Sequence, residues 1–285
     1  MSDTANSAVI RRADYTPPAF LIDSVALEFD LVAERTIVKN TMRVRRNPGA
    51  AHAARLELMG EALELLSVSL DGTSHAEHRV HEHGLVLDAV PDTFELTIVS
   101  ACKPAENTTL SGLYVSSGNF FTQCEAEGFR RITYFLDRPD VMATYTVTLR
   151  ADKIAYPVLL SNGNLVDTGD LPDGRHFAKW QDPFKKPSYL FALVAGKLVA
   201  LEERIRAGSG KEKLLQVWVE PHDLDKTRHA MDSLVNAIRW DEERFGLELD
   251  LDRFMIVAVS DFNMGAMENK GLNVFNTKYV LANPE

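Results

Sequence analysis

The sequence has little cysteine: Cys102 and Cys124 are the two in 285 residues. Two thiols are too few for a disulfide framework, so we expect both to stay reduced in the cytoplasm. No run approaches the roughly 20 apolar residues that cross a bilayer. Residues 1–6 lack the basic and apolar segments of a secretory signal. We therefore predict a cytoplasmic protein that does not bind membranes.

Positive charge is also in short supply, since 31 lysines and arginines face 41 acidic residues, a net charge of -10. This balance argues against nucleic acid or an anionic membrane surface as a partner. It would suit positively charged ligands, a free amino terminus among them. The content of 45% hydrophobic and 25% charged residues is typical of globular proteins, and the length suggests about two domains.

Period-two alternation of apolar and polar residues dominates the first part of the chain. It is clearest over residues 25–31, where Val, Leu, Phe and Leu alternate with Ala, Glu and Asp. Shorter strands separated by turn formers are indicated at residues 38–44, 56–58, 65–70, 85–87, 94–98 and 145–149. Strands at this spacing predict a mainly β fold with an antiparallel sandwich or saddle-shaped sheet.

A change of composition at Gly196-Lys197 places a domain boundary there, giving a β domain at residues 1–197 and a second segment at residues 198–285. In that segment a hairpin with its tip at residues 208–210 precedes a helix. We expect Asp223 to cap its start and Gly246 to end it. The strand-strand-helix-strand order predicts the opening part of an α+β domain.

The apolar face of the predicted helix consists of Met231, Leu234, Val235, Ile238 and Phe245. We also expect the three tryptophans to lie in the core: Trp180, Trp218 and Trp240.

The pentapeptide Gly-Ala-Met-Glu-Asn at residues 265–269 lies between two runs that are typical of buried strands. Gly265 and Ala266 leave the backbone uncovered, so an extended peptide could exchange main-chain hydrogen bonds with it. Glu268 would hold an ammonium group at the end of that edge. The alternative is a bulged edge strand with a solvated glutamate.

Residues 263–271, Asn-Met-Gly-Ala-Met-Glu-Asn-Lys-Gly, closely resemble the GAMEN exopeptidase motif of the zinc aminopeptidases of the alanyl (aminopeptidase N) type. Residues 122–130 resemble the segment of bacterial members that reaches the same pocket, and the similarity extends from about Leu113 to the end. Further matches lie at residues 134–140, 160–164 and 180–184. The resemblance implies an N-terminal β domain followed by the start of a thermolysin-like catalytic domain, with the boundary given above.

The resemblance implies a metalloaminopeptidase that hydrolyses the first bond of peptides with a free N-terminus. Its implied substrate-binding residues are Gln123, Glu125, Met264, Gly265, Ala266, Met267, Glu268 and Asn269, with Glu268 also catalytic. Two carboxylates and the Gln123 amide oxygen would accept the three N–H donors of the ammonium. Met264 would be an adjustable cushion for the first side chain, with plain core packing as the alternative.

Gln123, Glu125 and Glu127 alternate, which on a strand points all three to one side. Such acceptors need a cation, and either Arg130 or Arg131 could supply it in place of a substrate. We assign Glu127 to an arginine.

The family binds zinc through an H-E-x-x-H helix, whose two histidines share one face. None of the eight histidines begins that motif, and the histidine-rich residues 75–83 are typical of a polar surface hairpin. We therefore expect no zinc on this chain, which alone is predicted inactive. The resemblance implies that the ligands lie beyond residue 285, in a C-terminal part that is the partner of this one.

A non-catalytic peptide-binding or scaffolding module of the same fold, in a chain that ends at Glu285, stays open as the alternative. The epoxide-hydrolysing branch of the family has Gly where Ala266 stands, which disfavours it. If the chain is incomplete, the segment after Gly196 should expose apolar surface, whereas the first domain should fold alone.

Overall fold

The computed structural model describes residues 11–51 and 55–283. Its strands are β1 (Phe20–Asp30), β2 (Thr36–Arg46), β3 (Arg55–Met59), β4 (Glu64–Leu70), β5 (Thr73–Ser74), β6 (His78–His81), β7 (Gly84–Asp88), β8 (Thr93–Cys102), β9 (Gly112–Ser116), β10 (Asn119–Gln123), β11 (Ala143–Asp152), β12 (Val158–Ser161), β13 (Asn164–Asp170), β14 (Arg175–Lys186), β15 (Leu193–Gly196), β16 (Val199–Arg206), β17 (Glu212–Val219), β18 (Arg253–Val259), β19 (Ala266–Met267) and β20 (Leu272–Asn276). The α-helices are α1 (Arg228–Phe245) and α2 (Thr277–Val280), and the 3-10 helices are η1 (Arg12–Asp14), η2 (Pro104–Glu106), η3 (Phe129–Arg131), η4 (Pro172–Gly174), η5 (Ser188–Leu190) and η6 (Pro221–Lys226).

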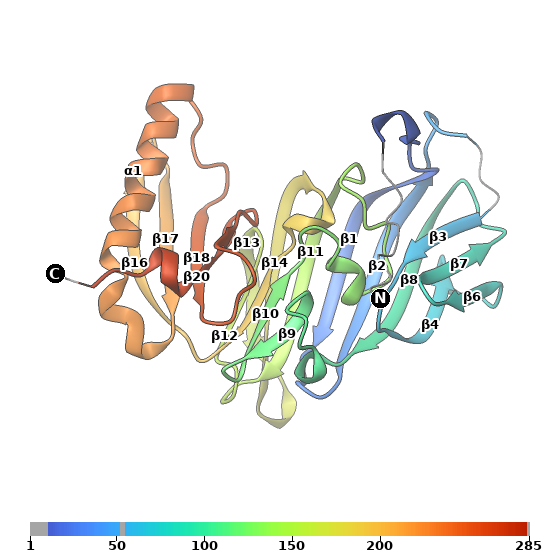
Figure 1. The fold of residues 1–285 in the computed structure, drawn as a ribbon, viewed down its shortest axis with the longest axis horizontal. Coiled ribbons are helices and arrows are strands. Elements are labelled where there is room, and N and C mark those ends of the chain that lie inside the picture. The colour runs from blue at the N-terminus through green and yellow to red at the C-terminus, as the bar shows by residue number, and fades with distance from the viewer. Residues whose placement is uncertain (1–10, 52–54, 284–285) are drawn as a thin grey trace, which may run out of the picture.

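The N-terminal region, up to Gly196, is built on an eight-stranded sheet in the order β13-β14-β11-β1-β2-β8-β4-β5 (Figure 1). The pairs are antiparallel except that β1 runs parallel to β11. Alternation along β1 buries Val25, Leu27 and Phe29 on one face, as the sequence predicts. The mainly β fold is therefore confirmed.

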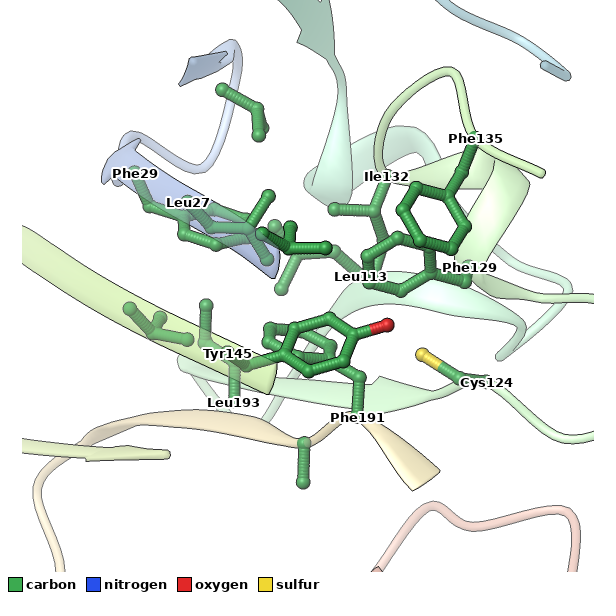
Figure 2. Close-up of a cluster of buried hydrophobic side chains, with 14 of the residues drawn as sticks. Leu27, Phe29, Leu113, Cys124, Phe129, Ile132, Phe135, Tyr145, Phe191 and Leu193 are labelled. Carbon is green, nitrogen blue, oxygen red and sulfur yellow. The ribbon is translucent and has the colours of Figure 1, made fainter. Parts of the chain in front are cut away.

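A four-stranded sheet (β12-β15-β10-β9) and a three-stranded sheet (β3-β7-β6) accompany the large one. Aromatic rings fill the core that they share (Figure 2). Phe191 stacks on Phe29 with ring centroids 6.1 Å apart and meets Phe129 edge-on at 5.3 Å. The Tyr145 and Phe191 ring centroids lie 6.4 Å apart, and in Figure 2 the Tyr145 hydroxyl points toward the Cys124 thiol. Both cysteines of the chain are free and buried.

The C-terminal segment, residues 198–283, forms a five-stranded sheet in the order β16-β17-β18-β20-β19. Its hairpin β16–β17 is where the sequence predicts it, and β17, β18 and β20 are parallel. Met255, Val257 and Val259 of β18 join the core of the N-terminal region, whereas Ile256 and Ala258 face α1. The sheet therefore lies between α1 and the N-terminal region, as Figure 1 shows.

Helix α1 differs from its prediction at its start and in the extent of its buried face. Thr227 is its N-cap, and Asp223 lies in the preceding η6, where its carboxylate is 2.6 Å from the Lys226 ammonium. Phe245 and Trp240 were expected in the core but are 58% and 56% exposed. Ile238 is the last buried residue of the helix.

The predicted helix stop at Gly246 is confirmed, since this residue adopts a left-handed φ of 66°. Among the described helices, none has both the length and the apolar composition that a membrane crossing needs.

Candidate functional site

The Gly-Ala-Met-Glu-Asn pentapeptide lies at the edge of the five-stranded sheet. Ala266 and Met267 form β19, which pairs with β20 on one side and with no other described strand. The Gly265 carbonyl accepts a hydrogen bond from the Asn276 amide at 3.0 Å, which extends this pairing by one step. Met267 is buried and Ala266 is exposed. The free side of β19 can therefore pair with an extended peptide.

The N-terminal region holds the loop that precedes β19. The Ser116 hydroxyl donates to the Asp261 carboxylate at 2.5 Å, and the Tyr114 hydroxyl donates to the Asp261 carbonyl at 3.0 Å. Burial raises the pKa of the Tyr114 phenol, and the Asp261 carboxylate adds to that rise, so the phenol remains a donor. The Asn263 amide donates to the Thr109 carbonyl at 2.9 Å. These contacts fix the entry to the pentapeptide.

The residues that follow β19 are fixed in the same way. Asn269 is fully buried and donates to the Phe191 carbonyl at 3.2 Å. Asn162 donates to the Lys270 carbonyl at 2.9 Å, and the Lys270 ammonium lies 4.5 Å from the centre of the Phe184 ring. The sequence offered no role for Asn162 or Phe184, although both fall in stretches that resemble the family.

Gln123 connects the two predicted halves of the site, which are 141 residues apart. It is buried at the end of β10, and its Nε2 donates to Met264 Sδ at 2.9 Å and to the Glu125 carbonyl at 3.2 Å. Its Oε1 has no hydrogen-bond partner among the described residues. A buried acceptor without a donor is unfavourable, so a donor arriving with a ligand would be stabilised there.

The predicted alternation of Gln123, Glu125 and Glu127 on one strand is wrong. Strand β10 ends at Gln123, and a turn follows, closed by a 2.8 Å hydrogen bond from the Gly128 amide to the Cys124 carbonyl. A Cβ at Gly128 would lie 2.3 Å from the Gln123 carbonyl oxygen, so glycine is needed for this close approach. The turn, and not a strand face, positions Glu125.

Arginine does not neutralise Glu125. Arg130 forms ion pairs with Asp137 at 3.0 Å and with Glu127 at 3.2 Å, which confirms the assignment of Glu127, and Arg131 pairs with Glu61. Within the described ranges Glu125 takes part in no ion pair. Its carboxylate is exposed and free to meet a cation.

Glu268 is likewise exposed and unpaired within the part of the chain that is described. Met264 is 36% exposed, so core packing does not account for it, whereas Met267 is 1% exposed and belongs to the core. The site thus offers two carboxylates, an orphaned amide oxygen, a flexible thioether and an open strand edge. Such a set can bind a cation joined to an extended backbone.

The residues present do not fit a zinc ion. Across residues 11–51 and 55–283, no group of three or more His, Cys, Asp or Glu side chains is arranged to hold a metal. His78 and His81 lie on the outer strand β6, and His78 Nδ1 is 2.7 Å from the His75 carbonyl. No chemical step can be derived through a metal in this chain.

Comparison with protein-family models matches residues 74–190 to the peptidase M1 N-terminal domain and residues 229–285 to the peptidase family M1 domain. Aminopeptidase N of Escherichia coli (strain K12) is 52% identical over 95% of this chain and 31% of its own length. Aminopeptidase N of Caulobacter vibrioides is 51% identical over 99% of this chain and 33% of its own length.

Among solved structures, Legionella pneumophila aminopeptidase A in complex with aspartic acid is similar, with a TM-score of 0.91 and 36% identity. The match covers 96% of this chain and 32% of that one. The chain therefore spans about a third of the length of the relatives it matches.

Proposed function

The chain belongs to the peptidase M1 family, and from that premise we propose that it is the N-terminal part of a metalloaminopeptidase. The enzyme would remove residues one at a time from peptides with a free N-terminus. Peptidases of this family are generally zinc-dependent. Because the described residues do not fit zinc, the metal would be held by the part of the longer polypeptide that follows. Its cytoplasmic location stays a prediction.

The contact between Gln123 and Met264 is the observation that carries this proposal. It brings the turn that bears Glu125 against the loop that leads to Glu268, beside the free edge of β19. Both glutamates are exposed and lack an ion pair among the described residues. A peptide pairing with β19 would place its ammonium between them.

This arrangement would favour peptides with a free N-terminus. An ammonium has three N–H donors, and two carboxylates with the Gln123 amide oxygen supply three acceptors. An internal peptide segment carries no charge at this point, so it would desolvate the carboxylates without pairing them. Gly265 and Ala266 would line the substrate backbone, and Met267 and Asn269 would hold that strand in place. Met264 would contact the first side chain.

We also propose the division into a β domain at residues 1–197 and the start of a catalytic domain at residues 198–285. The two family models fall on opposite sides of this boundary. The Gly196 position coincides with the end of β15, and the next strand already belongs to the five-stranded sheet.

Peptide binding by the 285-residue chain tests the amine site directly. The peptide Ala-Ala-Phe amide should perturb NMR signals of the chain, and its N-acetylated form should bind at least about tenfold more weakly. Glu268→Gln and Glu125→Gln should each weaken binding by about tenfold, because each removes a charged acceptor. Glu127→Gln is the matched control and should leave affinity within about twofold, since its carboxylate pairs with Arg130.

Equal binding of the free and acetylated peptides would overturn the amine site. So would equal losses in the control and in the two test variants. These outcomes separate recognition of an ammonium from a general effect of negative charge.

The coding sequence beyond codon 285 tests the assignment to an enzyme. An H-E-x-x-H motif within the next few dozen codons is expected, and a stop codon would support the non-catalytic module. The 285-residue chain should show no peptidase activity. One tightly bound zinc per chain in metal analysis would contradict the proposal.

A further inference from the structure

A cavity separate from the proposed peptide site lies where the N-terminal region meets the C-terminal segment. Its volume is about 440 Å³, and strands β12 to β14 line one side while β17 and β18 line the other. None of its lining residues belongs to the proposed peptide-binding set. A volume of this size is typical of pockets for small organic molecules.

Aromatic side chains make up much of the cavity wall. Trp180, Trp218 and Phe177 line it together with aliphatic residues of β12 and β13. Lys153, Asp170 and His176 line it as well, and Lys153 forms an ion pair with Asp170 at 2.6 Å. Trp180 is 1% exposed, and its indole N–H is already used in a 3.1 Å hydrogen bond to the Leu159 carbonyl. The wall therefore offers flat apolar surface, which favours an aromatic ligand.

Arg253 brings a positive charge beside the aromatic part of this cavity. Its guanidinium lies 5.2 Å from the centre of the Trp180 ring. Among the described residues no carboxylate forms an ion pair with it. Burial lowers the pKa of the guanidinium, and the carboxylates of Glu202 and Asp252 offset this only in part. A half-buried guanidinium that stacks near an aromatic ring but forms no ion pair favours a planar anion such as a carboxylate.

Two residues that line the cavity each carry a buried polar atom without a partner. Gln216 Oε1 and Trp218 Nε1 are buried and have no hydrogen-bond partner among the described residues. The Gln216 side chain is held by a 2.5 Å hydrogen bond from its Nε2 to Glu202. Parallel pairing of Leu214 with Arg253 places Arg253 on the same face of the sheet as Gln216 and Trp218. Buried polar groups in native proteins are normally satisfied, so these atoms indicate a polar ligand.

We propose that this cavity binds a small aromatic monocarboxylate, with the carboxylate on the Arg253 guanidinium and the indole N–H of Trp218, and the ring against Phe177. The two donors match the two carboxylate oxygens. The aromatic wall excludes small hydrophilic anions, which would lose hydration without gaining apolar contact. A ligand here would touch both parts of the chain at once and stabilise their packing.

The test uses 3-phenylpropanoate as the probe and two controls, the neutral 3-phenylpropanamide and acetate. Tryptophan fluorescence reports binding, because Trp180 and Trp218 line the cavity. A Trp240→Phe background removes the exposed third tryptophan. The probe should bind at least about tenfold more tightly than either control, since one control lacks the charge and the other lacks the ring.

Arg253→Gln should weaken binding of the probe by about tenfold or more. Arg253→Lys should weaken it by less, because lysine keeps the positive charge but loses the paired N–H donors of the guanidinium. Arg35→Gln is the matched control, an exposed arginine that pairs with Glu64 far from the cavity lining. Trp218→Phe should weaken binding of the probe several-fold, because it removes the indole N–H but keeps an aromatic side chain in the wall. Calorimetry measures this affinity.

Equal affinity for the acid and the amide would overturn the proposal. Unchanged binding in both Arg253 variants, with thermal unfolding like that of the parent, would do the same. If Arg253→Gln does not fold, Arg253→Lys decides the matter.

Discussion

Lys186 is a residue whose charge conflicts with its surroundings. It is 1% exposed, and its ammonium lies 3.1 Å from the Asp182 carboxylate and 3.8 Å from the centre of the Tyr145 ring. Burial lowers the pKa of Lys186 to about 8, while Asp182 acts in the opposite direction. The Lys186 amine is therefore still protonated near neutral pH, but it loses its proton at a lower pH than in the unfolded chain.

This pKa predicts how stability depends on pH. Below about 8 the lysine is protonated in both states, and between about 8 and about 10.4 the unfolded chain binds more protons. Stability contributed by this group should rise with pH across that window. Relative to Lys186→Met/Asp182→Asn, the free energy of unfolding should gain about 2 kcal/mol between pH 7.5 and 10.

Urea unfolding at a series of pH values measures this difference. The single variant Lys186→Met should be the least stable of the three near neutral pH, because it leaves the Asp182 carboxylate buried without its cation. A difference between the parent and the double variant that does not change with pH would contradict the assignment.

At the scale of elements, helix α1 ends at a residue set by the local sequence, beyond the part of the helix that packs on the sheet. Gly246 ends the helix with a left-handed φ of 66°, and its amide donates to the Glu242 carbonyl at 3.0 Å. The Trp240 and Phe245 rings beyond the buried stripe contact each other at 5.2 Å and remain exposed. The conformation of Gly246 therefore ends the helix. The buried residues of α1 stop earlier, at Ile238.

Gly246→Ala should destabilise the protein by about 1 kcal/mol, because a Cβ disfavours the left-handed conformation. The matched control is Gly49→Ala, where φ lies outside the left-handed range and a Cβ would meet ordinary contacts. Chemical denaturation of both variants measures the difference. Equal stabilities would show that the helix stop depends on packing and not on the backbone conformation.

At the scale of the molecule, the hydrophobic core crosses the proposed domain boundary. Met255, Val257 and Leu272 belong to the same buried cluster as residues of β1 and β11. Asn162 and Asn269 add a partly buried and a buried hydrogen bond across the boundary. The two parts of the chain are therefore expected to unfold together.

The whole chain should unfold in one transition that is the same by fluorescence and circular dichroism. A fragment of residues 1–197 should still fold, because it keeps the eight-stranded sheet. It should, however, bind the dye ANS more strongly and melt at a lower temperature, since the core side that faces β18 is uncovered. Two separate transitions in the whole chain would contradict this view of the core.

The sequence by itself determined the features that depend on residues close together along the chain. Period-two alternation predicted strands such as β1, the turn formers at residues 208–210 predicted the hairpin of β16 and β17, and the glycine at position 246 predicted the helix stop. The pentapeptide 265–269 also located one half of the candidate site, because its composition is unusual for a strand.

Only the tertiary structure decided how distant segments meet. It placed Glu125 on a turn, joined Gln123 to Met264 and set Arg253 over Trp180. No periodicity encodes these contacts, since each depends on where two separately formed elements pack. The position of each side chain made the difference, because Glu127 lies beside Arg130, whereas Glu125, on the same exposed turn, forms no ion pair among the described residues.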